Sequence, residues 1–374
     1  MSAALRIARL ELRAWRNLDA IALEPHARFT VLWGDNGAGK TSVLEAVGYV
    51  ARLESFRGAS AVRLVRDGEP CAHVVALAGV QHEPPHRIEV TLEAHGTRRV
   101  RVDERRPPSH RAHRARFPTV VFQPVDALLA VGAPEARRHW LDELLGLLDP
   151  AYATALEAYG RALRSRNRLL RRPEAPDPRA LDAYEALLDG AAVVLGRVRA
   201  SSCAWLGPSI ARDVEAIAGE AMRIQVRHAP RVEPESGALR ARLAASRELD
   251  RARGFTADGP HADDIAIEIR QPRGPVAARH HASQGQRRAL GIALRLAEAR
   301  LLERRLGTMP VLLLDDVSSE LDRTRAARLF GLLDTLSAQV LVTTTSPKHV
   351  PLDADALWVH VRDGRLVERT SRSP

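Results

Sequence analysis

The sequence predicts an α/β fold in which a nucleotide-binding core is divided by an inserted helical domain, and three observations support this prediction. A glycine-rich phosphate-binding pattern lies between a predicted strand at residues 29–33 and a predicted helix from residue 41 onward. A continuous apolar run ending in two carboxylates lies at residues 311–316, as expected for a buried parallel strand. Between these motifs, residues 134–253 show apolar spacing near 3.6, which is typical of helices.

The phosphate-binding pattern is the most specific feature of the chain. Its glycines allow backbone N–H groups to turn toward an anion, and the helix that follows adds positive charge at its N-terminus. We expect Lys40 to reach the β- and γ-phosphates and the Thr41 hydroxyl to bind Mg²⁺. A glycine-rich turn with an incidental lysine is the alternative, which the agreement of strand, loop and helix disfavours. The complete pattern comprises Gly34, Asp35, Asn36, Gly37, Ala38, Gly39, Lys40 and Thr41.

The composition indicates a polyanionic partner. The net charge is +10, which favours nucleic acid before a membrane, although a GC-rich genome that inflates the arginine content is an alternative. Aromatic residues make up only 4% of the chain, so we expect contacts to a nucleic-acid backbone and no base-stacking groove. The sequence contains no run of eighteen apolar residues, so it predicts no membrane span. Cys71 and Cys203 are far apart, which fits a reducing cytosol and predicts no zinc site.

The N-terminal region is predicted to be rich in strands. Alternation predicts a half-buried strand at residues 5–12, a second short strand after Leu18, and a small antiparallel sheet at residues 73–102. Residues 98–116 are dense in arginine and histidine, and we expect a mobile basic loop that could bind phosphate without specificity. Arg57 lies in a predicted turn after the first helix. Its side chain could contact DNA or a partner, and the alternative is an arginine that contacts only solvent.

A second strand end and a helical arm follow. An apolar strand ends at Gln123. In nucleotidases with a split head, a glutamine after such a strand contacts Mg²⁺ and the attacking water, although one glutamine alone is a weak signal. Helical spacing is clear at residues 140–148, 152–170, 180–198 and 210–218, with a proline-rich bend at 172–178 and a short strand at 223–228.

Two polar stretches precede the last strands. His261, Asp263 and Asp264 flank a turn at Gly259, and they could form either a functional cluster or a polar turn. Ser283 and Gln286 match a capping box for a helix of about 23 residues that ends near Gly307. A capped, glycine-bearing helix start can also contact a γ-phosphate, so Ser283, Gly285 and Gln286 are candidate nucleotide-binding residues.

The strand at residues 311–315 is predicted to bring two carboxylates to the phosphate loop. We expect Asp315 to hold Mg²⁺ together with Thr41, and Asp316 to position or deprotonate water. A helix at 323–336, a core strand at 339–345 and a hairpin formed by residues 357–361 and 365–368 complete the chain.

The order of these motifs resembles the ABC-type ATPase heads of the SMC and Rad50 group, and within that group most closely the RecF family. The resemblance covers nearly the whole chain and depends on GDNGAGKTSVLEAV, VVFQPVDALLAVGAPEARRHWLD, GPHADD, ASQGQRRALGIALRLAE and LLLDDVSSELD. Two departures are Ala262, where the family usually carries arginine, and Ser42, where it usually carries asparagine. The short helical arm also fits RecF, because SMC and Rad50 proteins carry long coiled coils.

The resemblance implies an ABC-type ATPase head formed by residues 1–133 and 255–374, with a mixed sheet around the phosphate loop, an antiparallel subdomain, and a helical arm at 134–254. It implies ATP and Mg²⁺ as cofactors and an ATP-dependent homodimer in which Ser283 of one subunit contacts the nucleotide of the other. Lys40, Gln123 and Asp316 would support weak ATP hydrolysis. The implied role is cytoplasmic: a recombination mediator that binds gapped or junction DNA, single- or double-stranded, and acts with RecO and RecR to load RecA.

Three alternatives belong to other functional classes. A transporter-associated ATPase would lack the arm and would need a membrane partner. A nuclease-coupled head would need a further cluster of metal-binding carboxylates, and the sequence offers no candidate for one. A scaffold that does not hydrolyse ATP is disfavoured by the intact Lys40, Asp315 and Asp316.

Overall fold

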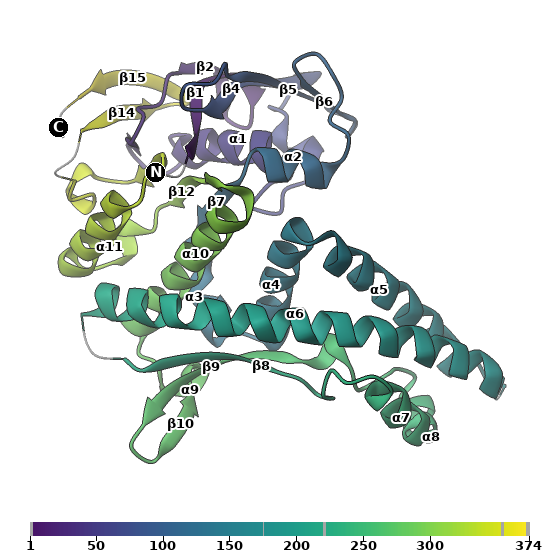
Figure 1. The fold of residues 1–374 in the computed structure, drawn as a ribbon. Helices are drawn as coiled ribbons and strands as arrows, with labels where there is room; N and C mark the ends of the chain where they lie inside the picture. The colour runs from purple at the N-terminus through teal and green to yellow at the C-terminus, as the bar shows by residue number, and fades with distance from the viewer. Residues whose placement is uncertain (1–2, 175, 220–221, 353–354, 372–374) are drawn as a thin grey trace. The chain divides into compact units, whose positions relative to one another are not determined.

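The computed structural model describes residues 3–174, 176–219, 222–352 and 355–371 (Figure 1). The chain divides into two compact units. The first unit comprises residues 1–126, 216–219 and 294–374, and the second comprises residues 127–215 and 220–293.

A mostly parallel sheet forms the base of the first unit. Its strand order is β15-β14-β3-β13-β12-β7, and only β15 pairs in antiparallel fashion. The parallel strands are nearly continuous apolar runs, so the sheet is buried on both faces. The strands are β3 (Phe29–Trp33), β7 (Thr119–Phe122), β12 (Val311–Asp315), β13 (Val340–Thr344), β14 (Ala356–Arg362) and β15 (Arg365–Thr370).

An antiparallel sheet forms the other layer of the first unit. The strand order is β11-β1-β4-β5-β6, with β2 also paired to β1, and only the short β1–β11 pair is parallel. The antiparallel sheet predicted at residues 73–102 is confirmed as β4, β5 and β6. Helix α1 (Lys40–Arg52) is buried along nearly its whole length and packs against strands of both sheets (Figure 1). The strands are β1 (Ala3–Trp15), β2 (Leu18–Leu23), β4 (Cys71–Val80), β5 (His86–Glu93), β6 (Arg98–Val102) and β11 (Thr308–Met309).

The expectation of a mobile basic loop at residues 98–116 is wrong for most of that range. Arg98–Val102 forms strand β6 at the edge of the antiparallel sheet, as the sheet predicted at residues 73–102 indicated, and His110–Arg116 forms helix α2. The helix begins because the Ser109 hydroxyl accepts a hydrogen bond from the Ala112 N–H at 3.0 Å. It is held in place because His113 is buried against the carbonyl of Val50.

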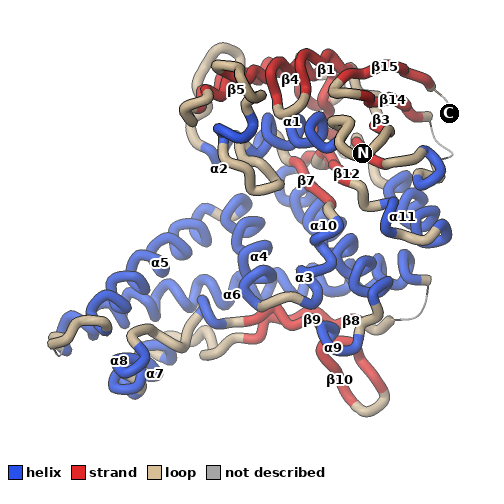
Figure 2. Tube along the Cα trace, turned by 180° about the vertical axis from the view of Figure 1, so that it is seen from behind, coloured by secondary structure: helices blue, strands red, loops and turns tan. Residues whose placement is uncertain are grey.

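The second unit is mainly helical, with a three-stranded antiparallel sheet of order β10-β9-β8 (Figure 2). The proline-rich bend lies between α5 and α6, as predicted, apart from Ala175, which is outside the described residues. Two of its helices continue into the first unit, which contains residues 216–218 of α6 and residues 294–306 of α10. The elements are α3 (Ala127–Val131), α4 (Pro134–Leu148), α5 (Pro150–Leu170), α6 (Pro178–Ala218), α7 (Ala238–Ala245), α8 (Arg247–Arg253), α9 (Ala278–His281), α10 (Gln284–Leu306), β8 (Ile224–Ala229), β9 (Asp264–Gln271) and β10 (Gly274–Ala277).

Helix α6 is longer than the apolar spacing indicated. The sequence pattern showed two separate helical stretches, whereas the structure has one helix that continues through Pro208. A proline inside a helix removes one backbone donor. Leu206, Ile210 and Val214 are buried on either side of it, and this packing keeps the helix continuous.

The polar turn before β9 has a structural role in the second unit. The buried Asp263 carboxylate accepts from the backbone N–H of Arg231 at 2.8 Å and lies 2.9 Å from His228 and 3.3 Å from Arg199. The Asp264 carboxylate pairs with Arg137. These contacts favour the polar-turn interpretation of the sequence over a catalytic cluster.

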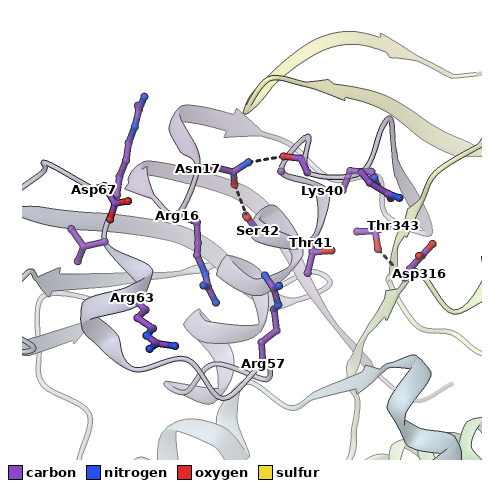
Figure 3. Close-up of a pocket in the computed structure, with 15 residues that line it drawn as sticks. Arg16, Asn17, Lys40, Thr41, Ser42, Arg57, Arg63, Asp67, Asp316 and Thr343 are labelled. Atoms are coloured by element: carbon purple, nitrogen blue, oxygen red, sulfur yellow. Dashed lines mark hydrogen bonds between the residues drawn. The ribbon is translucent and has the colours of Figure 1, made fainter.

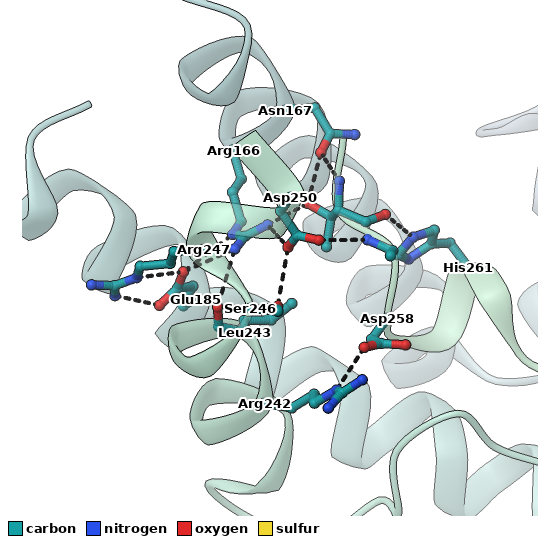
Figure 4. Close-up of polar contacts among 12 residues, drawn as sticks. Arg166, Asn167, Glu185, Arg242, Leu243, Ser246, Arg247, Asp250, Asp258 and His261 are labelled. Carbon is teal, nitrogen blue, oxygen red and sulfur yellow. Dashed lines mark hydrogen bonds and ion pairs between the residues drawn. The ribbon is translucent and has the colours of Figure 1, made fainter. Parts of the chain in front are cut away.

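A buried ion cluster stabilises the arm (Figure 4). The Arg166 guanidinium is fully buried and donates to Asp250 at 2.8 Å, to the Thr256 hydroxyl at 2.7 Å and to Glu185 at 3.1 Å. The Thr256 carbonyl in turn contacts His261 Nε2 at 2.9 Å. Because each buried charge has a partner, the cluster can hold α5, α6 and α8 together at a tolerable desolvation cost.

None of the helices in the described part of the chain is both long enough and apolar enough to cross a lipid bilayer.

Candidate nucleotide-binding site

A cavity of about 710 Å³ lies beside the phosphate loop in the first unit (Figure 3). Its wall combines the loop, the start of α1, the turn between β1 and β2, the segment 57–67 between α1 and β4, and the ends of β12 and β13. The lining is strongly basic and polar. It consists of Arg16, Asn17, Asn36, Gly37, Gly39, Lys40, Thr41, Ser42, Arg57, Arg63, Val65, Arg66, Asp67, Asp316 and Thr343.

The phosphate loop follows β3 and ends where α1 begins, as the sequence predicted. Gly34, Gly37 and Gly39 all have positive φ, which side chains rarely adopt. A Cβ on Gly34 would lie 2.2 Å from the Val361 carbonyl oxygen, so this glycine also permits close approach of β14. The loop therefore presents its backbone at the N-terminus of α1, where anions are favoured.

Lys40 caps the loop. Its buried ammonium donates to the carbonyl oxygens of Gly34 and Asp35, each at 2.8 Å. Burial lowers the pKa of Lys40, and the nearby carboxylates of Asp316 and Asp315 oppose this shift. The ammonium is thus held over the loop by weak, neutral acceptors that a phosphate oxygen can replace.

Thr41, Asp315 and Thr343 converge on one oxygen atom. The hydroxyls of Thr41 and Thr343 both donate to Asp315 Oδ1 at 2.8 Å, although 274 residues separate Thr41 from Asp315. Burial raises the pKa of Asp315, and these two hydrogen bonds oppose the shift. The parallel pairing of β12 with β13, which sets Asp315 opposite Thr343, brings the groups together.

These oxygen donors fit a magnesium ion. Mg²⁺ in phosphate sites is held by one or two carboxylates, hydroxyls and substrate phosphates, and it keeps several waters. Thr41 and Asp315 supply one hydroxyl and one carboxylate at the edge of the phosphate loop. In the described part of the chain no group of three or more His, Cys, Asp or Glu side chains could hold a metal ion.

Asp316 lies at the cavity in a strained backbone conformation. Its φ is 53°, in the left-handed region that non-glycine residues seldom adopt. Its backbone N–H donates to the Thr343 hydroxyl at 2.9 Å, so Thr343 connects the carboxylate of Asp315 with the backbone of Asp316. This conformation turns the chain at the end of β12, and Asp316 lines the cavity.

Gln123 follows β7 at the same edge of the sheet. Phe122 pairs with Leu314, so the next residues along the two strands, Gln123 and Asp315, are neighbours in the register. The Gln123 N–H donates to the buried Asp126 carboxylate at 2.7 Å. Gln123 is not one of the described residues that line the cavity. Its assignment to the attacking water therefore stays a prediction.

Ser283, Gly285 and Gln286 lie in the second unit at the start of α10. The predicted capping box is present, because the Ser283 N–H donates to Gln286 Oε1 at 2.8 Å and the Gln286 N–H donates to the Ser283 hydroxyl at 3.3 Å. Ser283 is exposed and the other two are partly buried. The Ser283 hydroxyl therefore accepts the capping hydrogen bond while the residue stays exposed at the surface.

Several lining residues were not identified from the sequence. Asn17 donates to the Gly37 carbonyl at 3.0 Å and accepts from the Ser42 hydroxyl at 2.8 Å, so it holds the phosphate loop against α1. Arg16 makes a bidentate pair with Glu45, at 2.8 Å for both bonds. Glu45 is fully buried. Glu45 is a carboxylate on the buried face of α1, and this position in the sequence could have indicated that it needs a basic partner such as Arg16.

Comparison with known proteins gives a consistent result. Residues 6–363 match the family model described as the RecF/RecN/SMC N terminal domain. The DNA replication and repair protein RecF of Myxococcus xanthus (strain DK1622) is 36% identical, and the alignment covers 99% of each chain.

Solved structures agree with this result. A structure of the recombination mediator protein RecF with ATP, in the RecFOR pathway, matches with a TM-score of 0.84 and 27% identity over 99% of both chains. The Smc head domain derived from Pyrococcus furiosus matches with a TM-score of 0.60 and 16% identity, over 99% of this chain and 96% of the other, which shows a shared fold. The fold is thus an ABC-type head with a helical insertion, and the chain belongs to the RecF family.

Proposed function

We propose that this protein is an ATP-dependent DNA-binding recombination mediator, and that the cavity beside Lys40 is its ATP site. The observation that carries the proposal is the hydrogen bond between Thr41 and Asp315 at the mouth of the phosphate loop. This bond brings together a hydroxyl and a carboxylate that are suited to magnesium. Lys40, the residue before Thr41, supplies an ammonium group that is suited to phosphate. The similarity to a solved structure of RecF with ATP supports the same ligand.

Each residue of the loop has a distinct task in this proposal. Lys40 exchanges its carbonyl acceptors for oxygens of the β- and γ-phosphates, and the loop N–H groups surround them. Thr41 and Asp315 hold Mg²⁺, which supplies positive charge against the triphosphate when it is bound. The arginines of the wall add further positive charge, because Arg16, Arg57 and Arg63 line the same cavity.

Hydrolysis in this proposal is slow and serves as a switch. Asp316 orients the water that attacks the γ-phosphorus and accepts a proton from it, the bond to the bridging oxygen breaks, and ADP and phosphate leave. ABC heads commonly carry glutamate at this position. Aspartate is one methylene shorter and should position water less well, and Gln123 contributes from the neighbouring strand end.

The switch acts through a homodimer. Ser283, Gly285 and Gln286 form a capped helix start in which Ser283 is exposed, and this start is suited to contact the γ-phosphate held by a second copy. ATP then clamps two heads, the clamped dimer holds gapped or junction DNA in the cytoplasm, and hydrolysis releases it. As a RecF family member, the protein would act with RecO and RecR to load RecA.

The test is a joint measurement of association and DNA affinity. Sedimentation velocity with ATP and Mg²⁺ should convert monomer to dimer, and fluorescence anisotropy should show tighter binding to duplex DNA under the same conditions. ADP serves as the control nucleotide and should support neither change. A protein that stays monomeric with saturating ATP would contradict the clamp mechanism.

A further inference from the structure

One segment of the first unit is strongly basic. Residues 98–116, which we call the basic segment, contain eight arginines against two carboxylates, Asp103 and Glu104. The segment therefore carries a net charge of +6 with histidine neutral, out of +10 for all 374 residues. It runs from β6 through a turn into α2, and both elements lie at the same end of the first unit (Figure 1).

The basic segment is ordered by groups other than its most exposed arginines. Asp103 accepts from the Arg87 N–H at 2.9 Å and contacts His86 at 2.7 Å, so it ties the turn to β5. His110 and His113 contact the carbonyls of Arg52 and Val50 at the end of α1, each at 2.8 Å. The backbone is thus anchored at the turn and along α2.

Four arginines of this segment keep their guanidinium groups available. Arg101, Arg105, Arg106 and Arg111 are exposed, and their side chains make no hydrogen bond or ion pair to any residue that the structure describes. Other arginines nearby differ, because Arg87 pairs with Glu89 at 2.7 Å and Arg99 pairs with Glu93 at 2.5 Å. The four available arginines lie within eleven residues of one another in the sequence.

Uncompensated positive charge on an ordered surface favours a polyanion. Duplex DNA carries one negative charge for about every 1.7 Å of its axis, so several arginines can contact phosphates at once. The basic segment has no Phe, Tyr or Trp on which bases could stack before Phe117, which is buried. A phosphate backbone therefore fits this surface better than unpaired bases do.

We propose that Arg101, Arg105, Arg106 and Arg111 form a contact surface for the phosphate backbone of duplex DNA. This inference rests on the proposed DNA-binding function and assigns that function to one surface. The contact is independent of sequence, because phosphate contacts position a protein on DNA and bases specify the site. This role also explains why the basic segment is rich in arginine although Asp103, His110 and His113 make the contacts that anchor its backbone.

The test compares two variants of equal charge. The surface variant replaces Arg101, Arg105, Arg106 and Arg111 by glutamine. The control variant replaces four exposed arginines that lie outside the basic segment and are already ion-paired, namely Arg9, Arg87, Arg227 and Arg242, each within 2.8 Å of a carboxylate. Both variants lose four positive charges. Any difference between their affinities for duplex DNA therefore depends on where the lost charges were.

Duplex affinity is measured with ATP and Mg²⁺ over a range of salt concentrations. The surface variant should bind at least about tenfold more weakly than the control, and its salt dependence should fall by up to about 3 to 4 in log–log slope. Both should still dimerise with ATP, and their melting temperatures should match that of the unaltered protein.

The outcomes separate this inference from the proposed function. Equal affinity and slope for the two variants, with DNA binding intact in the unaltered protein, would overturn the contact surface and leave the proposed function standing. An unaltered protein that binds no duplex would overturn both. A surface variant that loses affinity for vesicles of anionic lipid but keeps its affinity for DNA would show that this surface serves a membrane instead.

Discussion

Lys40 is the residue on which nucleotide affinity should depend most. Two carbonyl oxygens hold its ammonium group at the loop, so the positive charge is positioned before a triphosphate binds. We expect Lys40→Met to reduce ATP affinity by at least about a hundredfold, which corresponds to the loss of one charge-assisted contact of about 3 kcal/mol. Titration calorimetry with ATP and Mg²⁺ measures this change.

The chain offers a matched control in its only other lysine. Lys348 is exposed and lies in a short helical turn, Pro347–His349, away from the cavity lining. Lys348→Met removes the same charge and should leave ATP affinity unchanged. If both variants bind ATP as the unaltered protein does, the cavity is not the ATP site.

Asp316 should separate hydrolysis from binding. Asparagine has the same shape, tolerates the left-handed backbone found here, and cannot accept a proton from water. We expect Asp316→Asn to lower ATP turnover by about a hundredfold or more while ATP affinity stays within a factor of about three. Phosphate release under saturating ATP measures the turnover. Unchanged turnover would remove Asp316 from its proposed role.

At the scale of elements, α2 should make stability depend on pH through His113. Its Nε2–H donates to the Val50 carbonyl, while its Nδ1 is buried without a hydrogen-bond partner among the described residues. Burial lowers the pKa of His113 below its usual 6.5, so the unfolded chain binds this proton more readily than the folded chain. The contribution of His113 to stability is therefore full above about pH 6.5 and is lost as the pH falls toward the folded-state pKa.

Urea unfolding at pH 7, 6 and 5 tests this expectation. The free energy of unfolding should fall with pH, by up to about 1.4 kcal/mol for each pH unit below 6.5 from this group. His113→Gln keeps an N–H donor without a titrating group and should reduce the dependence. His82→Gln, at an exposed histidine, should not. Identical pH profiles for all three proteins would contradict the assignment to His113.

The elements that were predicted correctly depend on local chemistry. The strand before the phosphate loop, the capping box at Ser283 and the apolar strand ending at Asp315 are each encoded within a few residues. The segment at 98–116 was misjudged because its arginines and prolines suggested a loop. The helix there depends on the Ser109 cap and on the buried His113, whose partner is far away in the sequence.

The part of the cavity that the sequence missed depends on tertiary pairing. Thr343 reaches Asp315 only because β13 lies beside β12, and no local pattern states that order. Asn17 meets the loop because the turn between β1 and β2 lies against α1. Arg57 reaches the cavity from a turn that local patterns could not distinguish from a solvated one.

At the scale of the whole molecule, the proposed dimer predicts complementation between two defective variants. Each composite site would use Lys40 from one subunit and Ser283 from the other. Ser283→Asp keeps a strong helix cap but places a negative charge where a partner's γ-phosphate should lie. We expect this variant to bind ATP normally and to stay monomeric, whereas Ser283→Thr, which keeps the hydroxyl, should still dimerise.

Mixing Lys40→Met with Ser283→Asp should restore one site. In the mixed dimer, the intact phosphate loop of the Ser283→Asp subunit meets the intact serine of the Lys40→Met subunit, and the other site carries both defects. Sedimentation velocity with fluorescently labelled subunits should show an ATP-dependent heterodimer that neither variant forms alone. A site completed within one chain predicts no such rescue, so its absence would show that Ser283 does not act across the interface.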